Sequence, residues 1–184
     1  CRENPEVVAR TLHSLAALQW HDFEVLLVVN NTPDPAMVEP LRDLCEGLGD
    51  RFRFLNFPQI TGFKAGALNR ALDVTHPDAE IIAGVDADYT VEPNWLHDLV
   101  PHFADSKVAL VQAPQEHRDA DGSIVEKAMN AEYAGFFDIG MVQRARDNAI
   151  VAHGTMLLIR RTALDEVGRW DESHICEDTH LGLL

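Results

Sequence analysis

The chain alternates between segments with apolar residues at helical spacing and short, uninterrupted apolar runs. Apolar residues three or four positions apart predict helices over 5–18, 35–48, 67–74, 93–103 and 123–145. The apolar runs are short and β-prone, which predicts buried strands over 23–29, 52–57, 81–85, 108–112 and 155–159. Strands that alternate with helices predict an α/β fold with a mostly parallel sheet, covered by helices on both faces.

Local signals define three helix starts. Asn4 followed by Pro5 is typical of an N-cap and a first helical position. The segment from Gly62 to Gly66 is predicted to be a loop that opens the helix over 67–74. Thr162 and Asp165 have capping-box spacing, which predicts a short helix beginning there.

Length, charge and cysteine content limit the number of domains, the partners and the cellular compartment that this chain suggests. The 184 residues suffice for one domain, taken here as residues 1–184 of a longer protein and truncated at both ends. No segment approaches the roughly 20 apolar residues of a membrane span. A net charge of −15 disfavours nucleic acid as a partner, but not a nucleotide, because a bound metal can neutralise its phosphates. The three cysteines are odd in number and far apart, which predicts a reducing compartment without a disulfide framework.

Two acidic motifs carry most of the chemistry. Asp86 and Asp88 follow the predicted strand over 81–85, at the edge of an α/β sheet where ligands bind. Two carboxylates one residue apart suit a hard divalent cation that carries a phosphorylated ligand, although a polar turn has the same pattern. Glu177 and Asp178 lie about ninety residues later and offer a general base.

Three further segments are candidate binding elements. Lys64 lies in a glycine-containing segment before a helix, where a helix N-terminus attracts anions. Asn30 and Asn31 follow a predicted strand and offer amides to a base or ribose; a plain turn is the alternative. The segment from His153 through Gly154 to Thr155 has residues suited to a sugar pocket, and a turn explains them equally well.

A structural zinc site is the less favoured interpretation of the segment over 174–180. His174, Cys176 and His180 stand near Glu177 and Asp178, but their spacing is not an established zinc pattern.

Taken together, these motifs resemble the processive inverting glycosyltransferases of family 2, which include cellulose, hyaluronan and bacterial β-glucan synthases. The matching stretches are LLVVNNTPDP, GFKAGALNRAL, VDADYTVEPNWL, VQAPQ, EYAGFFDIG and HGTMLLIRRTALDEVGRWDESHICED. They follow the order of the family and cover nearly the whole chain. The HGT and CED segments are most similar to bacterial β-glucan synthases of the cyclic-glucan type.

The resemblance implies a GT-A fold and a nucleoside-diphosphate sugar donor, with UDP-glucose the first choice. It places Asp86 and Asp88 at the donor diphosphate, with Asp88 the better ligand for Mg²⁺ or Mn²⁺. Lys64 would contact the nucleotide, and Asn30 or Asn31 would lie beside uridine.

The same resemblance assigns the reaction. Asp178 would remove the proton from the acceptor hydroxyl of a growing glycan, and the hexose would be transferred in one displacement with inversion. Glu177, His153, Gly154 and Thr155 would line the junction of donor and acceptor.

The chain also departs from the family. Relatives usually carry aspartates where Asn30 and Asn31 stand, and many carry Glu in place of Asn4. A first strand, a Gln-x-x-Arg-Trp motif and the membrane helices of a polymer channel are expected outside this chain. The parent protein is accordingly expected at the cytoplasmic face of a bacterial inner membrane, with this domain soluble.

Two other functions stay open. Asp86-Ala-Asp88-Tyr89-Thr90 also fits the nucleophile motif of haloacid dehalogenase-type phosphatases, in which Asp86 would be phosphorylated. A non-catalytic nucleotide-sugar-binding domain is the other alternative. The donor sugar, the linkage, the product length and the oligomeric state are not determined by these motifs.

Overall fold

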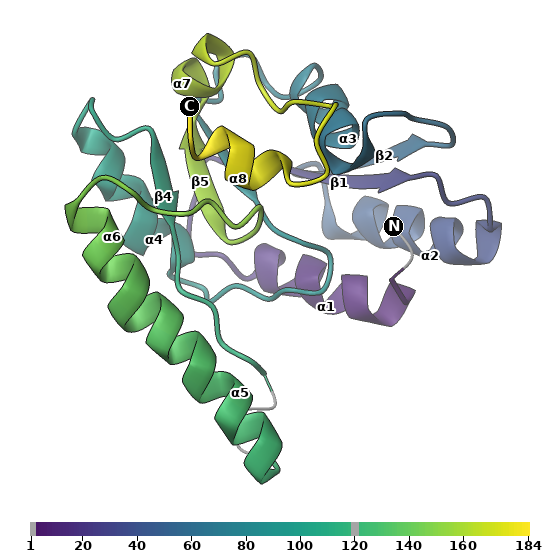
Figure 1. Cartoon of the computed structure of the whole chain (residues 1–184). Helices are drawn as coiled ribbons and strands as arrows, with labels where there is room; N and C mark the ends of the chain where they lie inside the picture. The colour runs from purple at the N-terminus through teal and green to yellow at the C-terminus, as the bar shows by residue number, and fades with distance from the viewer. Residues whose placement is uncertain (1–2, 119–121) are drawn as a thin grey trace.

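The computed structural model describes residues 3–118 and 122–184 (Figure 1). Its α-helices are α1 (Pro5–Ala16), α2 (Pro35–Leu48), α3 (Phe63–Leu72), α4 (Trp95–Leu99), α5 (Ile124–Ala134), α6 (Val142–Arg146), α7 (Arg161–Glu166) and α8 (Glu177–Leu181). A 3₁₀ helix, η1 (Val100–Ala104), follows α4, and a π-helix, η2 (Gly135–Met141), joins α5 to α6. The strands are β1 (Val25–Asn30), β2 (Phe52–Phe57), β3 (Ile81–Gly84), β4 (Leu110–Gln112) and β5 (Leu157–Arg160).

The strands pair in two sheets. β1 and β2 run parallel, as predicted, with Val25 opposite Phe52. The second sheet has the order β3-β5-β4, and β5 runs antiparallel to both neighbours. Gln112, the last residue of β4, pairs with Leu157, the first of β5. The chain therefore re-enters the sheet at the end from which it left, which makes β5 antiparallel rather than parallel.

Helices cover both faces of β5. Leu157 and Ile159 point to one face, where they form a core cluster with Leu72 of α3 and Leu164 of α7. Leu158, between them, is fully buried on the other face in the cluster that contains residues of α4. This alternation follows from the period of two in a strand. A third cluster buries α1 and α2 against β1 and β2.

Helix boundaries differ from the prediction, and three of the differences change the local interpretation. α3 begins at Phe63, so Gly66 lies inside the helix rather than in a loop; Gly62 in the left-handed conformation (φ 82°) is its N-cap. The predicted capping box at Thr162 is wrong, because α7 begins at Arg161 and Thr162 lies inside it. The helix predicted over 93–103 is α4 followed by η1, whose Pro101 cannot donate a helical hydrogen bond.

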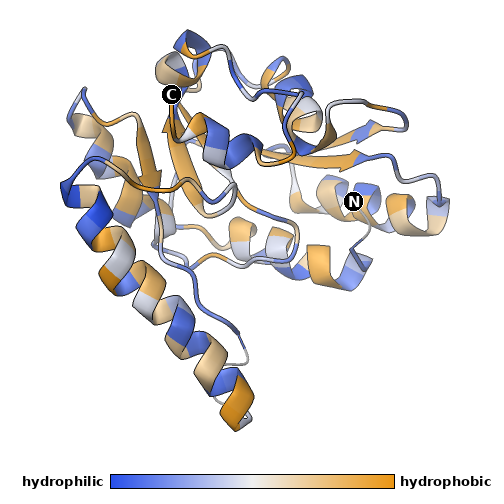
Figure 2. Cartoon of the chain, viewed as in Figure 1, coloured by the Kyte–Doolittle hydropathy of each residue, from blue (hydrophilic) through white to orange (hydrophobic). Residues whose placement is uncertain are grey.

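α5, η2 and α6 form one long helical arm, which corresponds to the helix predicted over 123–145 (Figure 1). Its start is a capping box between Ser123 and Glu126. Figure 2 shows hydrophobic colouring at the outer end of this arm, where Ile124 and Val125 are exposed. Across residues 3–118 and 122–184, no helix combines the length and apolar character needed to cross a membrane. Cys1 lies outside the described residues, and Cys45 and Cys176 are free thiols.

Candidate functional site

Lys64 joins three segments that are distant in the sequence. Its side chain extends from the first turn of α3, and Nζ donates to Oδ1 of Asp86 at 2.5 Å. The same nitrogen donates to the backbone carbonyl of Gly154 at 2.9 Å. α3, the loop after β3 and the loop before β5 therefore meet at one cation. The loop before β5 lies at this edge because β5 runs antiparallel to β3, with Gly84 opposite Leu157.

The segment from His153 to Thr155 is fixed by hydrogen bonds from two sides. The Thr155 hydroxyl accepts from the backbone N–H of Asp86 at 2.9 Å. The side chain of Gln112 accepts from the backbone N–H of His153 at 3.0 Å and donates to the carbonyl of Thr155 at 2.9 Å. Gln112 is not singled out by sequence reasoning, although it lies in the VQAPQ motif at the end of β4. It ties the candidate sugar-pocket segment to the sheet.

Glu177 and Asp178 begin α8 and lie against the same segment. A Cβ atom placed on Gly154, which has φ 64°, would be 2.7 Å from Oδ2 of Asp178, so glycine is needed for this close approach. Glu177 is buried, and burial raises the pKa of its carboxyl; Lys64 lowers that pKa, and Asp178 and Asp86 raise it. The charges that act on Glu177 are those of the predicted site, which the structure brings together.

Asp88 is the exposed member of the predicted metal pair. It lies in a turn closed by a hydrogen bond from the N–H of Tyr89 to the carbonyl of Asp86, at 3.1 Å. The contact with Lys64 uses Oδ1 of Asp86. Oδ2 of Asp86 and the carboxylate of Asp88 therefore offer oxygen ligands at the same turn. Such a donor set fits Mg²⁺ or Mn²⁺.

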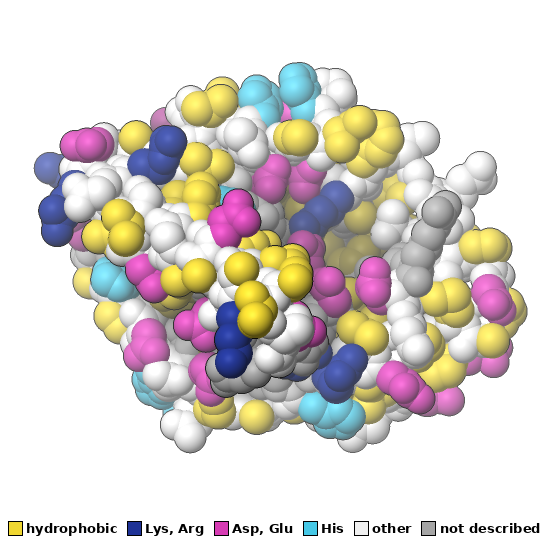
Figure 3. All heavy atoms as spheres, turned by 60° about the horizontal axis from the view of Figure 1, so that its bottom comes forward, with side chains coloured by type: hydrophobic (Ala, Val, Ile, Leu, Met, Phe, Trp, Pro, Cys, Tyr) yellow, Lys and Arg dark blue, Asp and Glu magenta, His cyan; other side chains and the backbone are white. Residues whose placement is uncertain are grey.

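In Figure 3 one face of the molecule is hollowed, with a basic side chain inside the hollow and acidic side chains around it.

Asn30 and Asn31 lie at the end of β1, as predicted, but the amide of Asn31 has a structural role. Its Nδ2 donates to the carbonyl of Ile60 at 3.1 Å, and its Oδ1 accepts from the N–H of Ile60 at 3.0 Å. Asn31 adopts a positive φ of 51°, which asparagine tolerates better than most residues. Asn30 ends the strand opposite Phe57.

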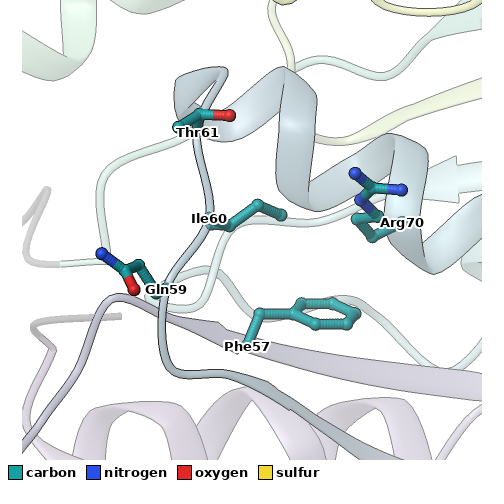
Figure 4. Close-up of a pocket in the computed structure, with 5 residues that line it drawn as sticks. All are labelled: Phe57, Gln59, Ile60, Thr61 and Arg70. Carbon is teal, nitrogen blue, oxygen red and sulfur yellow. The ribbon is translucent and has the colours of Figure 1, made fainter.

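The loop that Asn31 holds borders a cavity of about 360 Å³ (Figure 4). It is lined by Phe57, Gln59, Ile60, Thr61 and Arg70. In Figure 4, Arg70 extends from α3 and Phe57 from the end of β2, so the cavity lies between helix and strand. Sequence reasoning does not find it, because Gln59 lies in no recognised motif and Arg70, although part of GFKAGALNRAL, is not singled out there.

His153 lies between the arm and the site. Its ring contacts Phe136 and Phe137 at centroid distances of 5.1 and 5.3 Å. Its Nε2 is buried and has no hydrogen-bond partner among the described residues. The aromatic residues of η2 thus form one wall beside the segment from His153 to Thr155.

Comparison with known proteins identifies a family. Residues 1–168 match the family described as Glycosyl transferase family 2. The chain belongs to glycosyl transferase family 2. The predicted family is thereby confirmed, and the phosphatase alternative for Asp86 is not favoured.

Two curated relatives illustrate the range of this family 2 domain. It is 32% identical over 180 residues to the beta-monoglucosyldiacylglycerol synthase of Trichormus variabilis, covering 95% of this chain and 37% of that protein. It is 29% identical over 189 residues to the probable glucomannan 4-beta-mannosyltransferase 7 of Oryza sativa subsp. japonica, covering 97% of this chain and 32% of that protein. The chain thus spans about a third of the length of these relatives.

Solved structures show the same fold. The mannosyltransferase PcManGT from Pyrobaculum calidifontis, in complex with GDP-Man and Mn²⁺, superposes with a TM-score of 0.71 at 21% identity, over 98% of this chain and 48% of that one. TarS 1–349 from S. aureus superposes with a TM-score of 0.68 at 17% identity, over 98% and 51%. The predicted α/β class and GT-A fold are confirmed.

Proposed function

We propose that this family 2 domain transfers a hexose, with glucose the first choice, from a UDP-sugar to a hydroxyl of a growing glycan. The observation that carries the proposal is that Lys64 contacts both Asp86 and the carbonyl of Gly154, while the carboxylate of Asp178 lies against the same glycine. A cation, a metal-binding carboxylate and a base around one small residue suit a diphosphate leaving group beside an attacking hydroxyl.

In this proposal Asp86 and Asp88 hold Mg²⁺ or Mn²⁺. A divalent cation bound there stabilises negative charge on the departing diphosphate, so no separate general acid is needed. The Mn²⁺ in the PcManGT complex supports this assignment. Lys64 adds positive charge on the same side, because its Nζ is already oriented by Asp86 and Gly154.

Asp178 acts as the base. The acceptor oxygen attacks the anomeric carbon, the bond from that carbon to the diphosphate oxygen breaks, and the hydroxyl proton passes to the Asp178 carboxylate. A single displacement without a covalent intermediate inverts the anomeric configuration. Glu177 borders the same junction, and burial raises the pKa of its carboxyl. Asp178 is proposed as the base because its carboxylate lies against Gly154, beside the carbonyl that Lys64 contacts.

The names of the relatives support hexose transfer but divide over the sugar. One is a beta-monoglucosyldiacylglycerol synthase, and the other is a probable glucomannan 4-beta-mannosyltransferase. Assays of sugar transfer should therefore compare UDP-glucose with GDP-mannose as the donor, and a glycan with diacylglycerol as the acceptor. The parent protein is proposed to carry membrane helices and to work at the cytoplasmic face of a bacterial inner membrane.

The first experiment is calorimetric titration of UDP into the protein with and without Mn²⁺. Metal-dependent binding in the wild type that is lost in Asp88→Ala is the expected result. Asp43→Ala is the matched control, because Asp43 is exposed on α2, away from the site. Equal UDP binding with and without Mn²⁺ would contradict the metal assignment, and no UDP binding by the full-length protein would contradict the donor assignment.

A further inference from the structure

The loop between Trp170 and α8 gathers two imidazoles around one carboxylate. Oδ2 of Asp171 lies 3.0 Å from Nδ1 of His174 and 3.7 Å from Nδ1 of His180. The two rings are stacked nearly parallel, with centroids 4.7 Å apart and an interplanar angle of 6°. One ligand atom from each of the three residues lies within 4.8 Å of the others.

The carboxylate of Asp171 is held in place by Ser173. Its Oδ1 accepts from the backbone N–H of Ser173 at 2.8 Å and from the hydroxyl at 2.7 Å. These bonds occupy one oxygen and leave the other directed at the histidines. Hydrogen bonds of this kind to a ligating carboxylate orient metal ligands in proteins. The Ser173 hydroxyl oxygen also lies 2.8 Å from Nδ1 of His174, a contact that a metal ion at this nitrogen would replace.

The geometry is close to what a zinc ion requires. Zinc binds imidazole nitrogen and carboxylate oxygen at about 2.0–2.2 Å, so ligand atoms of a tetrahedral site lie roughly 3.3–3.5 Å apart. The two distances to Asp171, 3.0 and 3.7 Å, bracket that separation. Two nitrogens and one oxygen favour Zn²⁺ over Mg²⁺ or Mn²⁺, which prefer oxygen ligands. This donor set therefore differs in kind from the Asp86 and Asp88 pair.

The two histidines approach Asp171 through the same kind of atom. Nδ1 of each ring faces Oδ2 of Asp171, so a cation placed among the three residues contacts both rings. The sequence suggests Cys176 as the companion of the two histidines; the structure brings Asp171 to them.

The cluster connects two parts of the molecule. Asn69 of α3 donates to the carbonyl of Trp170 at 2.9 Å and to Oε1 of Glu172 at 3.1 Å, which fixes the start of the loop. His180 lies on α8, two residues after Asp178. An ion held by Asp171, His174 and His180 would join this loop to the helix that carries Asp178.

We propose that Asp171, His174 and His180 form a Zn²⁺ site with three protein ligands and a fourth position for water. The bound ion fixes α8 against the loop that precedes it. This site is separate from the proposed donor site and does not depend on the proposed transfer reaction, so either assignment can fail without the other.

The test is Zn²⁺ titration of the purified protein, with bound metal counted by mass spectrometry. Excess Mg²⁺ is present so that oxygen-ligand sites are occupied. Wild type is expected to bind one Zn²⁺ per chain, with affinity at least about tenfold weaker in His174→Gln and His180→Gln, a difference of about 1.4 kcal/mol. His76→Gln is the matched control, because His76 lies 3.9 Å from Asp78 as a single imidazole beside a carboxylate.

A spectroscopic readout reports the coordination geometry of the bound metal, and it is interpreted together with a check of the fold. Co²⁺ bound by wild type in place of Zn²⁺ is expected to give the visible absorption of a tetrahedral site, and Asp171→Asn is expected to lose it. Circular dichroism of each metal-free variant checks that the fold is intact. No saturable Zn²⁺ binding by wild type, or equal affinity in His174→Gln, His180→Gln and His76→Gln, would overturn the proposal.

Discussion

Nζ of Lys64 lies 2.5 Å from Oδ1 of Asp86, which joins the first turn of α3 to the loop that carries the paired aspartates. Both side chains are 39% exposed, so solvent screens the pair and its contribution to folding is small. The second hydrogen bond of Lys64, to the carbonyl of Gly154, extends this contact to the segment beside Asp178. The contact thus serves to position groups in the site rather than to stabilise the fold.

Replacing Lys64 is therefore expected to change ligand binding more than stability. Lys64→Ala should weaken UDP binding about tenfold, or about 1.4 kcal/mol, because a positive charge near the diphosphate is lost. The melting temperature should change little, since exposed ion pairs contribute about 0–1 kcal/mol. Calorimetry and thermal unfolding measure the two effects. Lys107→Ala, an exposed lysine elsewhere, is the control; an equal loss of affinity there would refute the role of Lys64.

Gly154 is expected to tolerate no side chain. Gly154→Ala places a Cβ 2.7 Å from Oδ2 of Asp178 and forces alanine into φ 64°, a conformation that costs roughly 1–2 kcal/mol. Both stability and glycosyl transfer should fall, since the base is displaced. The control is Gly47→Ala: Gly47 lies in α2, and its added Cβ meets no atom within 4 Å, so that variant should gain roughly 0.5–1 kcal/mol.

Thermal unfolding and donor turnover of these two glycine variants give a direct comparison. A Gly154→Ala protein that keeps wild-type transfer would mean that Asp178 does not depend on this close approach.

The candidate residues that sequence reasoning finds are those that lie in a local motif. Asp86, Lys64, Gly154 and Asp178 each lie in such a stretch. Asp86 follows the carboxyl end of β3, and the antiparallel pairing of β5 with β3 brings Gly154 to the same edge. The positions of β1, α2 and β2 were likewise predictable, since turn residues bound their apolar runs.

Other features depend on partners far along the chain. Gln112 forms hydrogen bonds with residues that lie 41–44 positions later in the chain. The register of β4 against β5 brings these residues together. The amide of Asn31 bonds to Ile60, 29 residues away, so no local pattern distinguishes it from a nucleotide-binding amide. The antiparallel direction of β5 also follows from the path of the helical arm rather than from the composition of the strand.

Glu177 is expected to make the stability of the protein depend on pH. Burial raises the pKa of its carboxyl, so the native state retains a proton that the unfolded state releases. Stability linked to Glu177 is therefore present below the pKa of the unfolded state, usually about 4.3, and is lost as pH rises through the higher pKa of the native state. Glu177→Gln should remove this fall. Denaturant unfolding from acidic to neutral pH, without divalent metal, measures the difference, and parallel curves for both proteins would contradict the prediction.

Replacing Asp178 distinguishes a catalytic domain from a domain that only binds nucleotide sugars. Asp178→Asn keeps the size of the side chain beside Gly154 but cannot accept the acceptor's proton. Transfer should fall about 10²–10⁴-fold, the usual contribution of a general base, with UDP affinity nearly unchanged. Turnover of UDP-glucose by the full-length protein measures the first effect, and calorimetry the second, with Asp43→Asn as an exposed control on α2. Unchanged turnover in Asp178→Asn alongside intact UDP binding would favour the non-catalytic alternative, because the same cluster would then hold the nucleotide without performing the proton transfer.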